Sequence, residues 1–265
     1  MREDIMDSKV VVITGASSGI GAALAKNLGA RGHKLVLAAR REELLKQIAK
    51  ETGTKAIPVV TDVTRRSDVE NLRDAALAEF GHVDVWVNNA GRGLTKTVME
   101  LTDEDVNNIT QIALKSVLYG IQTIIPHFQE RGEGHLINVS SFLGRVPLVS
   151  HRSIYNASKS GVNMLTANLR MDLKAKYPRI HVSLVMPGIV DTDFHRVAQS
   201  PMRMKAGERV GVQTVESAEY VAERIASLLE NPVAELYTSP GMSELAVRYY
   251  QDVGAFEAGM QFRRS

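Results

Sequence analysis

The segment Val10–Gly21 has the sequence VVVITGASSGIG, an apolar run followed by a glycine-rich turn. The run Val10–Ile13 is typical of a buried strand. Glycines let the backbone turn tightly and approach a pyrophosphate, and a helix starting there offers free N–H groups to its charge. The spacing G-x-x-x-G-x-G differs from the G-x-G-x-x-G fingerprint of dinucleotide-binding folds. The segment therefore predicts a strand, a phosphate-binding turn and a helix, with a merely structural turn as the alternative.

Short apolar runs alternate with amphipathic segments along the rest of the chain. Candidate strands are Val10–Ile13, Leu35–Ala38, Ala56–Val60, Val83–Val87, His135–Val139, His181–Val185 and Ala234–Tyr237. Candidate helices lie at about 19–29, 41–51, 67–80, 103–130, 155–176 and 216–230. The motifs Ser67-x-x-Glu70 and Thr102-x-x-Asp105 predict capping boxes at two helix starts. This alternation, without repeats or linkers, favours one α/β domain with a parallel sheet covered on both faces.

Composition narrows the function classes. The 265 residues carry a formal net charge of +2, so no general attraction to nucleic acid or membrane surfaces follows. The absence of cysteine excludes disulfides and thiolate chemistry and fits a reducing compartment. We see no apolar stretch near the ~18 residues of a membrane span, no signal-peptide pattern and no compact metal-ligand cluster. We expect a cytoplasmic protein that binds no metal, nucleic acid or membrane.

A Ser pair, a Tyr and a Lys lie in the segment His135–Lys159, HLINVSSFLGRVPLVSHRSIYNASK. If Tyr155 and Lys159 are helical, their i,i+4 spacing places phenol and ammonium on one face. A nearby Lys⁺ favours phenolate and would lower the pKa of the Tyr, which then exchanges protons near neutral pH. A surface Tyr over a helix turn is the alternative for this motif taken alone.

The end of the second candidate strand bears on the choice of cofactor. An acid there would bind the ribose 2′-OH of NAD, whereas a nearby Arg accommodates a 2′-phosphate. Ala39 occupies the acid's place, and Arg40 and Arg41 follow. The sequence thus favours NADP(H), unless both arginines are only a solvated helix start. Asp62, after the third strand, is a candidate adenine contact or an ordinary turn former.

Five motifs occur in order at these strand ends: TGASSGIG, DV at Asp62, NNAG at Asn88–Gly91, Ser with Y-x-x-x-K, and PG-x-V-x-T at Pro187–Thr192. Together they resemble the short-chain dehydrogenase/reductase family over about residues 9–240. The resemblance implies a doubly wound, Rossmann-type domain with a seven-stranded parallel sheet. It also implies hydride transfer between NAD(P)(H) and a carbonyl or alcohol.

The resemblance assigns roles residue by residue. Tyr155 would be the general acid/base, Lys159 would lower its pKa and hold the nicotinamide ribose, and Ser141 would donate a hydrogen bond to the substrate oxygen. Asn89 and Gly91 would line the adenosine-side ribose, and Pro187–Thr192 the nicotinamide carboxamide. The residues expected to bind NADP(H) are Gly15, Ser17, Ser18, Gly19, Ile20, Gly21, Arg40, Asp62, Val63, Asn89, Ala90, Gly91, Tyr155, Lys159, Pro187, Gly188, Val190 and Thr192.

The chain departs from the family pattern in two places. Tyr155 lies fourteen positions after Ser141, one more than is common, and Ser140 is the alternative donor. Ala113 occupies the place of a family Asn that completes a catalytic tetrad and holds a proton-relay water, and Ser116 stands where a Gly is usual. A methyl group cannot hold that water, so Ser116 or a water held by Lys159 would have to serve.

These departures leave two functions open, a carbonyl reductase or alcohol dehydrogenase and a non-catalytic NADP(H)-binding sensor or scaffold. Ser141, Tyr155 and Lys159 favour the enzyme, because a binding protein needs no acid/base set. The domain would span residues 1–265, with a substrate lid at about 191–213 and a C-terminal tail at about 241–265. A second apolar stripe on the helix at 155–176 predicts a homodimer or homotetramer. The sequence does not identify the small carbonyl or alcohol substrate.

Overall fold

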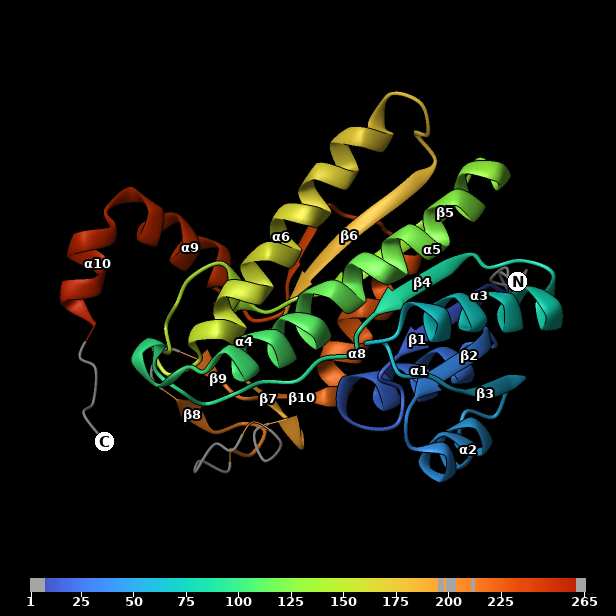
Figure 1. Cartoon of the computed structure of the whole chain (residues 1–265), viewed down its shortest axis with the longest axis horizontal. Coiled ribbons are helices and arrows are strands. Elements are labelled where there is room, and N and C mark those ends of the chain that lie inside the picture. The colour runs from blue at the N-terminus through green and yellow to red at the C-terminus, as the bar shows by residue number, and fades with distance from the viewer. Residues whose placement is uncertain (1–7, 195–197, 199–203, 211–212, 261–265) are drawn as a thin grey trace, which may run out of the picture.

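A computed structural model describes residues 8–194, 198, 204–210 and 213–260 of the chain. Its centre is a seven-stranded parallel sheet with the strand order β11-β6-β5-β4-β1-β2-β3 (Figure 1). The strands are β1 Val10–Thr14, β2 Lys34–Ala39, β3 Ala56–Val60, β4 Val85–Asn88, β5 Gly134–Val139, β6 Ile180–Met186 and β11 Glu235–Tyr237. The chain leaves β1 toward β3 and returns to place β4 beside β1. Ligands of such folds bind at this reversal, beyond the carboxyl ends of the strands.

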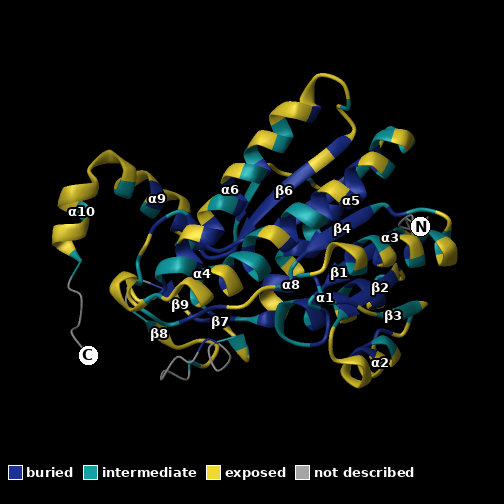
Figure 2. Ribbon diagram, in the orientation of Figure 1, coloured by how far each residue is buried: buried dark blue, intermediate teal, exposed yellow. Residues whose placement is uncertain are grey.

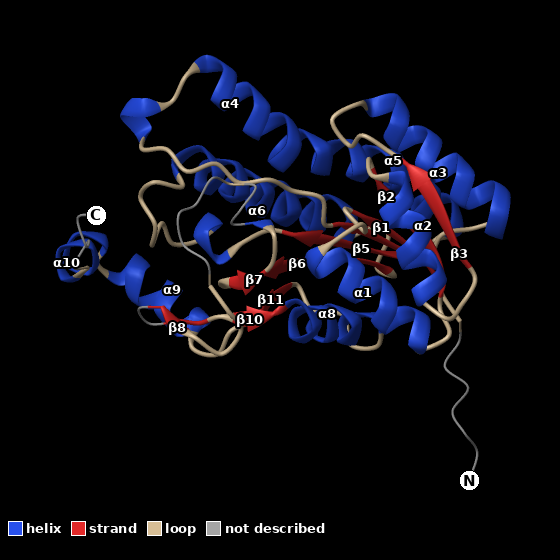
Figure 3. Ribbon diagram, turned by 90° about the horizontal axis from the view of Figure 1, so that it is seen from below, coloured by secondary structure: helices blue, strands red, loops and turns tan. Residues whose placement is uncertain are grey.

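Helices cover both faces of the sheet, as predicted for a doubly wound fold. The helices are α1 Gly19–Ala30, α2 Glu42–Glu51, α3 Arg66–Phe80, α4 Asp103–Thr110, α5 Ser116–Arg131, α6 Ser153–Lys174 and α8 Ala218–Ala226. Figure 3 shows α4, α5 and α6 above the strands and α1 and α8 below them. The seven-stranded sheet and the Rossmann-type architecture predicted from the sequence are confirmed.

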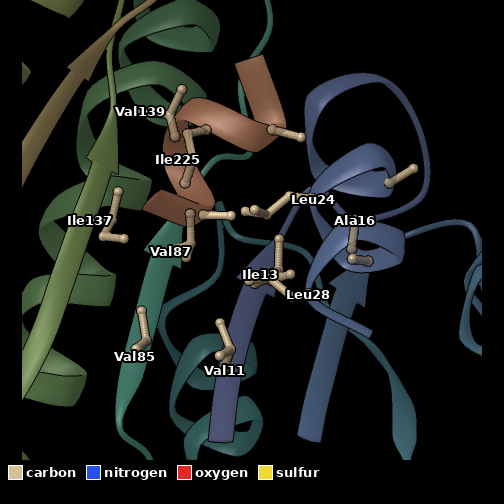
Figure 4. Packing of buried hydrophobic residues seen from close by; sticks show 14 of the residues in the cluster. Val11, Ile13, Ala16, Leu24, Leu28, Val85, Val87, Ile137, Val139 and Ile225 are labelled. Carbon is tan, nitrogen blue, oxygen red and sulfur yellow. The ribbon is translucent and has the colours of Figure 1, made fainter. Parts of the chain in front are cut away.

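Alternate residues of each strand supply two separate apolar cores. Val11 and Ile13 of β1 pack with Leu24 and Leu28 of α1, and Ile225 of α8 joins them (Figure 4). Val12, between those two strand residues, points to the opposite face, where α3, α5 and α6 contribute the core. Because β1 and β2 are buried on both faces, these strands are apolar along almost their whole length rather than alternating.

Of the two capping boxes predicted at helix starts, one is present and one is not. Thr102 and Asp105 form the predicted capping box of α4. The capping box predicted at Ser67 is wrong, because α3 already begins at Arg66. A turn with a 2.9 Å hydrogen bond from Arg65 N to Asp62 O leads the chain into the helix, and Ser67 lies within its first turn.

The helix predicted at 103–130 is not continuous. A π-helical turn, Gln111–Lys115, separates α4 from α5. Ser116 Oγ donates a 2.7 Å hydrogen bond to Ile112 O, and the side chain of Gln111 donates one to Thr64 O. Such a turn inserts one extra residue into the helix and is frequent at functional sites.

Several short elements were not predicted. β7 Val190–Asp191 pairs with β10 Glu216–Ser217, and β8 Arg209–Val210 pairs with β9 Gln213–Thr214. The predicted C-terminal tail contains α9 Met242–Gln251 and α10 Val253–Gly259, which extend away from the sheet and are largely exposed (Figure 2). In the described part of the chain, no helix is both long and apolar enough to span a membrane.

Candidate active site

The glycine turn after β1 lies against the segment that follows β4. Gly15 has φ of 70°, and a Cβ there would come within 2.9 Å of Ala90 Cα. Thr14 Oγ1 accepts hydrogen bonds from the backbone N–H groups of Asn89 (3.0 Å) and Ala90 (3.1 Å). The Asn89 amide donates back to Thr14 O at 2.9 Å, so this side chain holds the turn. The two motifs therefore form one rigid unit at the topological reversal.

This unit has the features that a dinucleotide requires. The first backbone N–H groups of α1 have no partner within the helix and can bind phosphate. A Cβ on Gly19 would meet Thr192 Cγ2 at 3.2 Å, and one on Gly91 would meet Lys159 Nζ at 3.8 Å. The glycine turn, the NNAG segment, Lys159 and Thr192 therefore converge at the carboxyl ends of the strands. The bare backbone at Gly19 and Gly91 leaves the close approach that a pyrophosphate and a ribose need, so the residues fit a nicotinamide dinucleotide.

Arg41 rather than Arg40 contacts the glycine turn. Its guanidinium donates to Ser17 Oγ at 2.8 and 3.2 Å and to Ser18 Oγ at 2.7 Å. Arg40 is exposed. The sequence predicted Arg40 as the cofactor contact. Arg41 is adjacent to it in the sequence, and the structure shows that Arg41 is the arginine that reaches the glycine turn.

Asp62 lies at the end of β3, and its carboxylate is bonded within its own turn. Asp62 Oδ1 accepts hydrogen bonds from the backbone N–H and hydroxyl of Thr64. Partial burial alone would raise the pKa of Asp62, but the Thr64 hydrogen bonds and the charge of Arg40 outweigh it and lower the pKa. The following residue, Val63, is buried in the core beside it. The carboxylate is thus ionised at neutral pH and can accept from an amino group.

Ser141, Tyr155 and Lys159 come together beyond β5 and at the start of α6. All three are buried, with Tyr155 7% and Lys159 3% exposed. Lys159 Nζ lies 5.9 Å from the centre of the Tyr155 ring and donates a 2.9 Å hydrogen bond to Val139 O. The Ser141 hydroxyl lies within hydrogen-bonding reach of the phenol. The one-residue-longer loop between Ser141 and Tyr155 therefore does not separate them.

Ser140, the alternative donor, faces away from this group. Its hydroxyl donates to Asn163 Oδ1 at 2.6 Å and to Lys159 O at 3.2 Å, which ties the end of β5 to α6. Ser141 instead begins a 3₁₀ turn, Phe142–Gly144, and accepts from Leu143 N. The geometry favours Ser141 as the donor toward a substrate.

The predicted direction of the Tyr155 pKa shift is wrong for the protein alone. Burial raises the pKa of Tyr155 to about 12, although the Ser141 hydrogen bond and the charge of Arg152 oppose this. Burial also lowers the pKa of Lys159 to about 8. The i,i+4 spacing correctly placed the two groups on one helix face, but it carried no information about desolvation, which dominates both shifts.

Ala113 lies within the π-helical turn and packs directly against the catalytic candidate. It is fully buried in a small apolar cluster with Leu94, Ile109 and Tyr155. Ser116, considered as a replacement for the family Asn, bonds back to its own helix at Ile112 O. An apolar contact thus occupies the position where the family pattern has an amide.

The loop Pro187–Thr192 is held by groups that sequence reasoning missed. Pro187 O accepts a 2.9 Å hydrogen bond from Phe142 N, which joins the loop to the Ser141 turn. Glu216 Oε2 accepts from Gly188 N at 3.3 Å and from Thr238 Oγ1 at 2.6 Å. Burial raises the pKa of Glu216, against these hydrogen bonds. The sequence around Glu216 gave no sign of its contact with Gly188, because Gly188 lies on a distant segment of the chain.

A cavity of about 490 Å³ lies on the Glu216 side of this loop and includes Ser239 and Met242 in its lining. Of the predicted lid, residues 195–197, 199–203 and 211–212 lie outside the described residues, as do 1–7 of the domain and 261–265 of the tail.

Comparisons with known proteins identify the family. The family model described as short chain dehydrogenase matches residues 9–202. A curated protein of Staphylococcus epidermidis, named an uncharacterized oxidoreductase, is 32% identical over 224 residues, covering 84% of this chain and 92% of that protein. The chain belongs to the short-chain dehydrogenase family and is a nucleotide-binding oxidoreductase.

Two solved structures are similar over most of the chain. A short-chain dehydrogenase/reductase from Burkholderia phymatum, in complex with NAD, has a TM-score of 0.83 and 28% identity and covers 93% of this chain and 94% of its own. A variant of actinorhodin polyketide ketoreductase with NADPH has a TM-score of 0.79 and 32% identity. The match covers 89% of this chain and 97% of that chain. The first relative holds NAD and the second NADPH, so the cofactor preference has to be argued from this chain's own residues.

Proposed function

We propose that this chain transfers a hydride between NADP(H) and a carbonyl or secondary alcohol, with Tyr155 as general acid/base. The observation that carries the proposal is the burial of Ser141, Tyr155 and Lys159 together at the carboxyl ends of the strands. They lie beside a glycine turn that leaves room for a dinucleotide. A protein that only binds a nucleotide has no need of this acid/base group.

The residues divide the work of the reaction. The glycine turn, the NNAG segment and the loop Pro187–Thr192 would hold NADP(H), which supplies or accepts the hydride. Ser141 donates a hydrogen bond to the substrate oxygen. Tyr155, whose pKa is raised to about 12, is protonated at neutral pH and donates its proton to that oxygen during reduction. Lys159, with its pKa lowered to about 8, is largely charged at neutral pH and stabilises the phenolate that forms.

The test is consumption of NADPH by the wild-type protein against a broad panel of ketones, aldehydes and quinones. We expect turnover despite Ala113, because the proton donor, the Lys and the Ser are all in place. Ala113→Asn should change kcat by less than about tenfold, which is roughly 1.4 kcal/mol of barrier.

The alternative is a non-catalytic NADP(H)-binding sensor or scaffold, and the apolar contact of Ala113 with Tyr155 favours it. A wild type that binds NADPH but reduces nothing, together with an Ala113→Asn variant that does, would establish that alternative.

The proposed preference for NADP(H) rests on two features at the end of β2. Ala39 stands where an acid would bind the ribose of NAD, and the arginines Arg40 and Arg41 follow it. We expect Arg41→Ala to raise the NADPH dissociation constant about 10- to 100-fold, because an Arg–phosphate contact contributes about 1.5–3 kcal/mol. Arg40→Ala is the matched variant, and NADH affinity should change little in either one. Equal dissociation constants of the wild type for NADH and NADPH would contradict the preference. A loss that is confined to Arg40→Ala would assign the contact to Arg40 instead.

Self-association as a homodimer or homotetramer stays a prediction. The second apolar stripe of α6 is exposed in this single chain, where Met164 is 59% and Met171 67% exposed. A soluble protein gains by covering such a stripe with a second copy.

A further inference from the structure

The cavity of about 490 Å³ beside the loop Pro187–Thr192 is separate from the acid/base group. It lies between the segment around β8 and β9, the start of α8 and the turn that joins β11 to α9. Among the described residues, its lining includes none of Ser141, Tyr155 and Lys159. Its volume falls within the range of about 300–1,000 Å³ that is typical of small-molecule sites.

Three buried side-chain oxygens in this lining have no hydrogen-bond partner among the described residues. They are Glu216 Oε1, Gln213 Oε1 and Ser239 Oγ, and Glu216 and Gln213 are 8% and 7% exposed. A Cβ on Gly188 would come within 2.5 Å of Ser239 Oγ and 3.0 Å of Gln213 Oε1, so these side chains gather beside the glycine. Buried polar atoms without a partner are rare in folded proteins and call for an explanation such as a bound ligand, ion or water.

The neighbouring polar groups of the cavity are already paired. Glu216 Oε2 accepts from Gly188 N and Thr238 Oγ1. The Ser217 hydroxyl accepts from Tyr220 N at the start of α8, and the Tyr220 hydroxyl donates to Thr238 O. The unpartnered carboxylate and amide oxygens can only accept hydrogen bonds. A ligand that satisfies them therefore has to donate.

Glu216 also brings a negative charge to the cavity. It forms no salt bridge with any described residue. Burial raises its pKa, whereas its hydrogen bonds and the more distant charge of Arg224 lower it. The Ser239 hydroxyl approaches the carboxylate closely enough to lower this pKa too, but it forms no well-aligned hydrogen bond there. A cation bound at Oε1 would favour the ionised carboxylate further, so a positively charged donor fits this position.

The shape of the cavity favours an organic cation over a metal ion. Val215 and Met242, both buried, form an apolar wall together with Pro240 and the ring of Tyr220. The described residues hold no group of three His, Cys, Asp or Glu side chains that could ligate a metal ion. The cavity is also many times larger than the ~30 Å³ share of a single water molecule, so it has room for a body that packs on the apolar wall.

We propose that this cavity binds a small primary amine as its ammonium ion. The ammonium donates hydrogen bonds to Glu216 Oε1 and Gln213 Oε1, and the body of the amine lies against the apolar wall. This is a second ligand site, on the far side of the loop Pro187–Thr192 from the reaction at Tyr155. The inference goes beyond the proposed function and does not depend on turnover.

The test is calorimetric titration of the full chain with three ligands that share one body. 2-Phenylethylamine carries the charge and the N–H donors, 2-phenylethanol is neutral, and trimethyl(2-phenylethyl)ammonium keeps the charge without a donor. We expect the amine to bind at least about tenfold more tightly than either of the others, because a charge-assisted hydrogen bond needs both features. Equal binding of the three ligands, or no binding of the amine, would refute the site.

Two variants locate the contact. Glu216→Gln removes the charge and should raise the dissociation constant of the amine about 10- to 100-fold while changing that of the alcohol little. Gln213→Met keeps the length of the side chain without its amide and should raise it about 2- to 10-fold. The control Glu219→Gln makes the same change at an exposed carboxylate in the first turn of α8 and should stay within about twofold of wild type. If Glu216→Gln does not fold, Gln213→Met against the control decides the question. Unchanged amine binding in the folded variants would overturn the assignment.

A titration at saturating NADP⁺ separates this cavity from the dinucleotide site. We expect the amine still to bind, because the cavity lies behind the loop rather than over the reacting groups. Loss of amine binding would mean that the unpartnered oxygens serve the carboxamide of the cofactor, and the second site would be refuted. If the protein binds no NADP⁺ or turns over no substrate, the proposed function fails, but the amine titration of the protein alone still decides this inference.

Discussion

Tyr155→Phe is expected to lower kcat at least ~10²-fold while leaving the NADPH dissociation constant nearly unchanged. Phe retains the ring that packs with Phe194 and the apolar cluster, so the fold around the site should persist. It removes only the hydroxyl, which is the proposed proton donor. Steady-state kinetics with a ketone from the panel measures the loss, and a fluorescence titration measures NADPH binding.

Tyr177→Phe is the matched control for this variant. Tyr177 lies just before the amino end of β6. The site lies at the carboxyl ends of the strands, so Tyr177 is at the opposite end of the sheet. The same hydroxyl loss there should leave kcat within about twofold. Turnover of Tyr155→Phe near the wild-type rate would remove Tyr155 from the mechanism, whatever the behaviour of the control.

The sheet was predictable because its strands are buried on both faces. The runs at β1 and β2 contain almost only apolar residues, so their position in the sequence predicts both the strands and the core. Breaks within helices leave a weaker signal. The π-helical turn Gln111–Lys115 has residues that a continuous α-helix would also accept, and the insertion shows only in the backbone of the folded chain.

The site was partly predictable, because short spacings report on local geometry. The i,i+4 spacing of Tyr155 and Lys159 on α6 is of this kind. The choice between Ser140 and Ser141 needed the structure, since it depends on Asn163 of α6, which accepts a hydrogen bond from Ser140. The pKa of Tyr155 also needed it, because desolvation is a property of the folded surroundings.

Contacts between distant segments were beyond the sequence. Arg41 contacts Ser17 across 24 positions of the chain, and Glu216 contacts Gly188 across 28 positions. A residue that belongs to no recognisable sequence motif does not indicate which distant residue it will contact.

The second large effect is expected at the glycine turn, where Gly21→Ala should raise the NADPH dissociation constant at least about tenfold and lower the melting temperature. An added Cβ would come within 2.6 Å of Asn89 Nδ2 and nearer still to the carbonyl oxygen of Gly15. Neither group can easily withdraw, because Asn89 is bonded to Thr14 O and Gly15 is part of the turn itself. Overpacking of this kind costs about 1–3 kcal/mol, and every 1.4 kcal/mol is tenfold in affinity.

The sign of this effect is informative because helix propensity opposes it. Gly21 lies in the first turn of α1, where Ala is intrinsically preferred over Gly by up to about 1 kcal/mol. Gly259→Ala is the control, since a Cβ there meets nothing within 4 Å, and it should leave NADPH binding unchanged. If Gly21→Ala melts higher than wild type and binds NADPH equally well, propensity has won over the overlap. The turn would then tolerate a side chain beside Gly15, and the expectation that packing around Gly21 governs NADPH binding would be wrong.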